Sequence, residues 1–74
     1  PATTIRFALP QASQVTLAVY NVLGQRVATL MSGERLNAGV HAIGFDASGL
    51  SSGMYVYRLE AGNYVQQRSM TLLK

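Results

Sequence analysis

The segment Gly49-Leu50-Ser51-Ser52-Gly53 has the G-x-S-x-G spacing of a nucleophile elbow, in which a serine attacks an ester or amide carbonyl. Such an elbow lies on a turn from a strand into a helix, and the histidine of its triad follows the serine in the chain. Here β-prone residues follow Gly53, and the single histidine, His41, precedes Ser51. We therefore interpret the segment as a Ser/Gly-rich turn and expect that the chain is not an enzyme.

His41 and Asp46 could act as a base and its orienting carboxylate only if their side chains met. They are five residues apart, on or next to one predicted strand. Because side chains alternate between the two faces of a strand, an odd spacing places them on opposite faces. We expect instead that His41 is partly buried and that a ring nitrogen bonds to a backbone group.

The three acidic residues, Glu34, Asp46 and Glu60, lie in or beside three separate predicted turns. A retaining glycosidase needs two carboxyl groups about 5–5.5 Å apart in a cleft, which this arrangement does not predict. A calcium site at Asp46 with loop carbonyls is one alternative, and an Asx-type turn of Asp46 with Ser48 and Gly49 is the favoured one. We expect no cofactor and no bound metal.

The four tyrosines could form a platform on which sugar rings stack. Tyr55 and Tyr57 lie on one face of a predicted strand and are expected in the core, which leaves Tyr20 and Tyr64 as the candidates for exposure. Trp, a common residue in sugar-binding sites, is absent. Carbohydrate binding therefore remains an alternative rather than the favoured function.

The composition is that of one small folded domain. Its 74 residues are 49% hydrophobic and only 12% charged, without cysteine, and this balance argues against intrinsic disorder. The net charge of +3 is scattered without a basic run, so we expect no nucleic-acid partner. No stretch approaches the roughly 18 apolar residues of a membrane span. A domain this short has little surplus stability to support a strained catalytic site.

Alternating apolar residues dominate the chain and predict strands rather than helices. The alternation predicts strands over residues 3–9, 15–20, 26–31, 40–45, 54–60 and 64–73, with a seventh, very short strand at Leu36. Broken alternation predicts a bulge within 26–31 and another near Gln66 and Gln67. Regular short strands of this kind predict an all-β fold, an immunoglobulin-like β-sandwich of six to seven antiparallel strands.

Turn-forming residues separate these strands, over 21–24, 32–34, 37–39, 46–53 and 61–63, with Gly24 expected at positive φ. The same alternation predicts one core between two sheets, made of Ile5, Phe7, Leu9, Val15, Leu17, Val19, Ile43, Phe45, Tyr55, Tyr57 and Leu59. The segment 52–57 (Ser-Gly-Met-Tyr-Val-Tyr) is similar to the tyrosine corner of immunoglobulin-like domains. It predicts that the inward-facing Tyr55 donates its hydroxyl to the backbone upstream.

Several stretches together carry a resemblance to a known family. They are residues 3–10 (TTIRFALP), 15–27 (VTLAVYNVLGQRV), 39–41 (GVH), 45–46 (FD), 50–59 (LSSGMYVYRL) and 68–74 (RSMTLLK). In this order they resemble the C-terminal sorting domain (type A) of the type IX secretion system. They are also similar to the immunoglobulin-like domain of flagellar hook-capping proteins. The hook-capping pattern has Trp-Asp-Gly where this chain has Phe45-Asp46-Ala47, which favours the sorting domain.

The resemblance implies a non-catalytic export signal. Residues 1–74 would be a single C-terminal β-sandwich sorting domain, a fragment of a longer secreted protein whose N-terminal cargo is an enzyme or adhesin. The cargo would cross the periplasm, pass the outer-membrane translocon and end at the cell surface or in the medium, where a sortase-like peptidase removes the domain. The residues that match the terminal motif, and so are implied in translocon recognition, are Arg68, Met70, Leu72, Leu73 and Lys74. Gly53 and Tyr55 match structural positions. The alternative function is a carbohydrate-binding or inert immunoglobulin-like spacer module.

Overall fold

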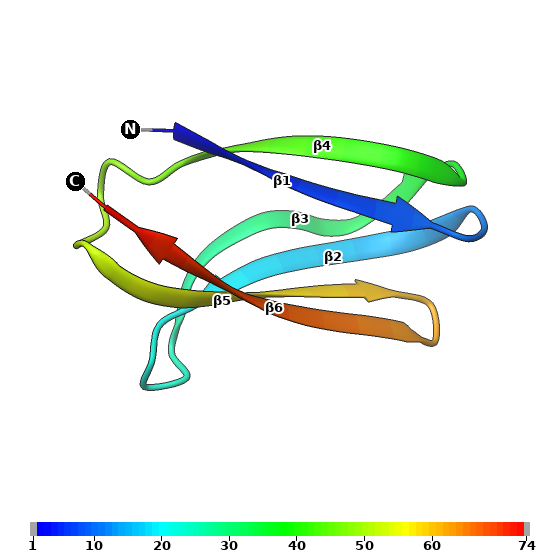
Figure 1. Cartoon of the computed structure of the whole chain (residues 1–74). Helices are drawn as coiled ribbons and strands as arrows, with labels where there is room; N and C mark the ends of the chain where they lie inside the picture. Colours follow the sequence, from blue (N-terminus) through cyan, green and yellow to red (C-terminus); the bar gives the residue numbers. More distant parts are fainter. Residues whose placement is uncertain (1, 74) are drawn as a thin grey trace.

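The computed structural model describes residues 2–73, which form six antiparallel strands in two stacked sheets (Figure 1). The strands are β1 (Ala2–Leu9), β2 (Ser13–Tyr20), β3 (Arg26–Leu36), β4 (Gly39–Asp46), β5 (Gly53–Ala61) and β6 (Tyr64–Leu72). One sheet holds β1 and β4, and the other has the order β3-β2-β5-β6. The predicted β-sandwich is therefore confirmed, with six strands in the described part of the chain.

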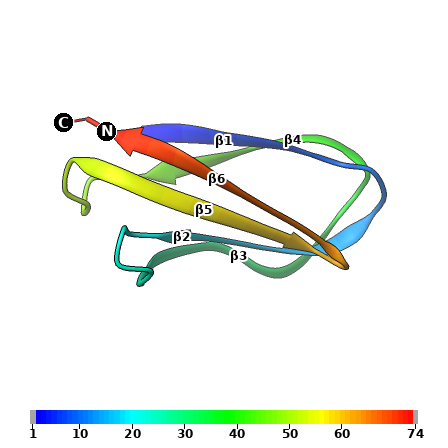
Figure 2. The ribbon, with the colours of Figure 1, turned by 60° about the horizontal axis from the view of Figure 1, so that its bottom comes forward.

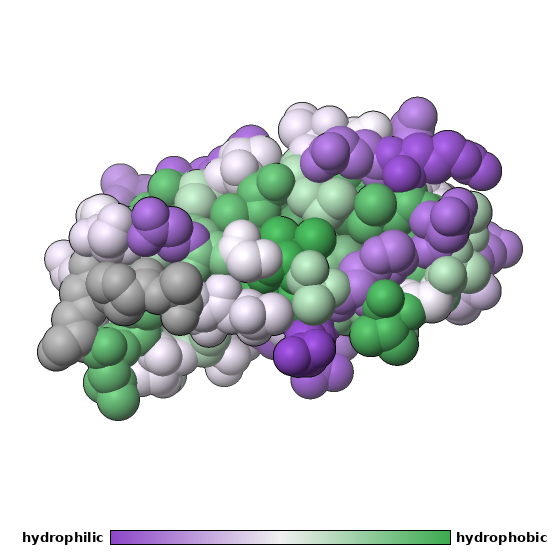
Figure 3. Space-filling model, turned by 90° about the horizontal axis from the view of Figure 1, so that it is seen from above, coloured by the Kyte–Doolittle hydropathy of each residue, from purple (hydrophilic) through white to green (hydrophobic). Residues whose placement is uncertain are grey.

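The core lies between the two sheets, as the alternation predicts. The buried cluster is Ile5, Phe7, Leu9, Val15, Leu17, Val19, Met31, Phe45, Ala47, Tyr55, Leu59, Ala61 and Leu72. Ile43 and Tyr57, which the pattern places in the core, are half-buried and pack against this cluster. The sheet of two strands packs on the wider sheet of four strands. The view onto β1 and β4 shows hydrophobic residues along the middle of the molecule, between hydrophilic ones (Figure 3).

Strand β3 corrects two predictions. Residues 32–34 do not form a turn, and Leu36 is not a separate strand, because β3 continues to Leu36. Between the pairs Val15–Glu34 and Leu17–Met31 the β3 side has one extra residue, and Gly33 lies there at a φ of 68°. This is a glycine bulge, which bends a strand without ending its ladder, so the turn-like composition was misleading. Two more register shifts occur within 26–31, where a bulge was predicted.

Strand β6 corrects a third prediction, the bulge near Gln66 and Gln67. Its pairing with β5 runs without a register shift from Gly53–Leu72 to Ala61–Tyr64. The alternation breaks for another reason: the inward-facing positions in the first half of β6 are polar. The two-stranded sheet does not bury these positions, so they do not need apolar side chains.

A tyrosine corner joins the loop after β4 to the start of β5. Tyr55 is buried and donates its hydroxyl to the Ser51 carbonyl at 2.8 Å, as predicted. Gly53 begins the strand at a φ of 151°, a conformation that L side chains rarely adopt. The corner thus fixes the direction in which the chain enters β5.

We expect Tyr55→Phe to lower the free energy of unfolding by about 1–2 kcal/mol, since a partly buried hydrogen bond to the Ser51 carbonyl is lost. Tyr64→Phe is the matched control, because Tyr64 is exposed and its hydroxyl bonds to the Gln66 side chain rather than to the backbone. Urea unfolding of both variants measures the difference. Equal losses at the two positions would contradict the structural role of the corner.

Candidate functional site

Strand β6 lies at the edge of the four-stranded sheet and, among residues 2–73, pairs only with β5. The connecting hairpin has two central residues, Gly62 and Asn63, with Gly62 at a φ of 61°, as in a type II′ turn. The residues that flank such a turn form a hydrogen-bonded pair, and hydrogen-bonded and open pairs then alternate along the ladder. The backbone amides of Val65, Gln67, Ser69 and Thr71 therefore face the free edge.

The two edges of this sheet differ in regularity. Strand β3, at one edge, carries three register shifts against β2. Strand β6, at the other, is regular over its full length. Bulges disrupt the repeat that a further strand would need, whereas a regular edge is a template for strand addition. Of the two, β6 is therefore the edge that suits an added strand.

Three residues of the predicted terminal motif, Arg68, Met70 and Leu72, share the inward face of β6, and Leu73 follows the strand. Leu72 is buried at 7% exposure, and Met70 packs against the core. Arg68 is on the same face but exposed. Leu73, directly after β6, is 81% exposed. Lys74 lies outside the described residues.

The tyrosine corner positions this motif through the β5–β6 ladder. Gly53 pairs with Leu72, and Tyr55 pairs with Met70. The two residues expected to be structural thus lie directly beside two of the three apolar residues of the motif. The end of β6 and the start of β1 lie at the same end of the sandwich in both ribbon views (Figures 1 and 2).

A row of three polar side chains on the inward face of β6 was not predicted. In the amide orientation that satisfies both ends of Gln66, its nitrogen donates to the Tyr64 hydroxyl at 3.0 Å, and its oxygen accepts from Nε and Nη2 of Arg68, each at 2.8 Å. The spacing i, i+2, i+4 on an edge strand is the signal that could have identified it. The row holds the Arg68 guanidinium in place along the free strand.

The candidate catalytic residues have structural partners instead. A ring nitrogen of His41 lies 2.7 Å from the Asn37 carbonyl oxygen, and its ring stacks on Phe7, which confirms the predicted backbone partner. The Asp46 carboxylate accepts from the Ser48 amide at 3.0 Å, the predicted Asx turn. Ser51 precedes a strand and not a helix, so the sequence match to a nucleophile elbow has no structural counterpart.

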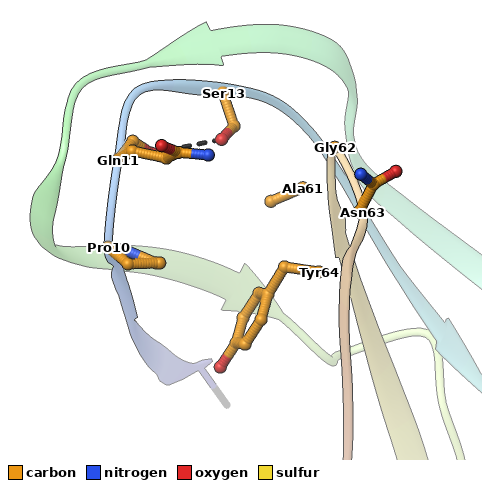
Figure 4. Close-up of a pocket in the computed structure, with 7 residues that line it drawn as sticks. All are labelled: Pro10, Gln11, Ser13, Ala61, Gly62, Asn63 and Tyr64. Carbon is orange, nitrogen blue, oxygen red and sulfur yellow. Dashed lines mark hydrogen bonds between the residues drawn. The ribbon is translucent and has the colours of Figure 1, made fainter.

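The two tyrosines considered for sugar stacking do not share a surface. Tyr64 lines a hollow of about 300 Å³ between the β1–β2 connection and the β5–β6 hairpin (Figure 4). Tyr20 lines another, of about 400 Å³, beside the β2–β3 turn on the outer face of the large sheet. Neither hollow was predicted from the sequence. The separation removes the basis for a common platform.

Residues 2–73 include no helix with the length and apolar character needed to span a membrane. Within the same residues, no group of three or more His, Cys, Asp or Glu side chains is placed to hold a metal ion.

The profile of the secretion system C-terminal sorting domain matches residues 2–72. Comparisons with curated proteins and with solved structures find no significant match. The profile match extends from the first residue of β1 to the last residue of β6, and so includes both sheets and the free edge. The chain therefore belongs to the family of secretion system C-terminal sorting domains, the signals by which the type IX system exports proteins to the cell surface or the medium.

Proposed function

We propose that this chain is a type A sorting domain at the C-terminal end of a longer secreted protein. Its N-terminal cargo is the exported enzyme or adhesin, and the outer-membrane translocon and a sortase-like peptidase are its partners. The family match and the sequence of the terminal motif support this assignment. Phe45-Asp46-Ala47, in place of the Trp-Asp-Gly of hook-capping proteins, supports a sorting domain over that related type.

The domain itself is non-catalytic in this proposal. The Ser51 carbonyl holds Tyr55, the His41 ring is held between Asn37 and Phe7, and the Asp46 carboxylate closes a turn. The imidazole of His41 and the carboxylate of Asp46 thus have structural partners, and Ser51 precedes a strand instead of the helix that a nucleophile elbow needs. The role that remains for the domain is binding.

The translocon recognises the domain by adding a strand to β6. The observation that carries this proposal is the free edge of β6, which is regular along the described strand, whereas the opposite edge of the same sheet, β3, is bulged. Strand addition gives affinity through the backbone, and side chains of the edge strand give specificity. Arg68 and the exposed Leu73 lie where an added strand would meet them.

Replacing Ser69 by proline tests this mode of recognition. The Ser69 amide faces the free edge, so proline removes a donor that an added strand needs while leaving the bonds to β5. We expect a reporter fused to residues 1–74 with Ser69→Pro to accumulate in the periplasm of a host that has the type IX system. Reporter activity in periplasm, cell surface and medium measures the effect.

Ser69→Ala is the matched control, because it alters the same exposed side chain and retains the backbone amide. We expect this variant to be exported like the wild type. Circular dichroism of both purified domains checks that proline has not unfolded the sandwich. A folded Ser69→Pro domain that is exported normally would rule out strand addition at β6.

A further inference from the structure

The β2–β3 turn, residues 21–25, is a rigid loop built around Asn21. The Asn21 carboxamide oxygen accepts from the amides of Leu23 and Gln25, at 2.9 and 3.0 Å. Its amide nitrogen donates to the Gln25 side chain at 2.9 Å. Two backbone bonds close the turn, from Asn21 to the Gln25 carbonyl and from Gly24 to the Asn21 carbonyl. The conformation of the loop is therefore set by its own hydrogen bonds.

This turn exposes two large apolar side chains. Val22 is 74% exposed and Leu23 is 78% exposed. A short surface turn is ordinarily polar, and neither side chain contributes to the core. Because the loop is already ordered, a partner that covers these side chains loses little conformational entropy on binding. Val22 and Leu23 thus have the properties of a preorganised apolar contact.

The turn lies at the same end of the sandwich as the end of β6 (Figures 1 and 2). Tyr20, the last residue of β2, pairs with Val56 of β5, and Val56 pairs with Ser69 of β6. The turn therefore begins one residue after a row of paired residues that runs across the sheet to β6. Two further exposed apolar residues, Met54 and Leu73, are at this end. Exposed apolar side chains therefore gather around the region where the terminal motif ends.

A hollow of about 400 Å³ connects the turn with β6. It is lined on one side by residues of the turn, on the other by Gln67 of β6, and by Val56 and Arg58 between them. Arg58 is paired with Glu60 at 3.4 Å, so its charge is partly balanced within the domain. The floor of the hollow thus combines apolar and polar groups and reaches the strand whose edge is free.

We propose that Val22, Leu23 and this hollow form a second contact for the protein that binds β6, one that presents apolar side chains to them. This inference rests on the proposed function and adds a requirement to it. A strand that pairs with β6 at Gln67 and Ser69 would lie beside the hollow, so one partner can fill both. The terminal strand alone is then not sufficient, because the second contact exists only in the folded domain.

The double substitution Val22→Ser and Leu23→Ser tests the second contact. Both side chains are exposed, so we expect little change in melting temperature. Export of a reporter fused to residues 1–74 is expected to fall about tenfold, the loss in affinity typical of removing a buried apolar contact at an interface. Leu23→Ser alone is expected to give a smaller fall, since Val22 still lines the hollow.

Val40→Ser is the matched control, because Val40 is 76% exposed but lies at the opposite end, paired with Ala8. We expect its export to equal that of the wild type. If the wild-type fusion is exported and the double variant is exported equally well, the proposal of a second contact is wrong, while the proposed sorting function is still supported. If the wild-type fusion stays in the periplasm, both fail. A change from dimer to monomer in the double variant, by analytical ultracentrifugation, would instead assign the contact to a second copy.

Discussion

A Phe45→Ala variant is expected to be largely unfolded. Phe45 is 4% exposed and belongs to the buried cluster, in the sheet that has only two strands. Truncation of a buried phenylalanine to alanine costs about 3–5 kcal/mol. Small domains have total stabilities near the low end of about 5–15 kcal/mol, so this loss removes most of the folded population. Thermal unfolding followed by circular dichroism measures it.

Val40→Ala, on the same strand, is the control for this prediction. Val40 is exposed, and its truncation leaves the core unchanged, so its melting temperature should stay close to that of the wild type. A Phe45→Ala variant that also melts within a few degrees of the wild type would show that β4 does not close the core.

The strands were predictable because apolar residues alternate along them and turn residues separate them. The prediction was wrong at β3, where a turn was expected over residues 32–34, because composition cannot distinguish a glycine bulge from a turn. Gly33 takes the positive φ typical of both, and only the pairing of Glu34 with Val15 and Met31 with Leu17 tells them apart. Local sequence describes the conformation of one chain segment, whereas a bulge is a relation between two strands.

The candidate site was only partly predictable for a related reason. The resemblance identified residues of the terminal motif, but burial assigns Leu72 to the core and leaves Leu73 exposed. The row of Tyr64, Gln66 and Arg68 was missed because polar residues at inward positions looked like a bulge. They are tolerated because the smaller sheet does not cover this part of β6, which depends on how two sheets of unequal width stack.

Export is expected to be lost when the end of the last strand is removed. Removing residues 70–74 deletes the end of the edge that a partner strand would pair with, together with the exposed Leu73. It also removes Leu72 from the core, so this deletion alone cannot separate recognition from folding. The folded Ser69→Pro variant supplies that separation, since it retains every core residue.

Attachment of residues 1–74 to the C-terminus of a periplasmic reporter, in a host with the type IX system, tests the sorting function most directly. The measurement is reporter activity in the periplasm, at the cell surface and in the medium. We predict that the intact fusion reaches the surface or the medium, and that the fusion lacking residues 70–74 remains active in the periplasm. An intact fusion retained in the periplasm, or a truncated one exported as well as the intact one, would contradict the sorting function and favour an inert spacer.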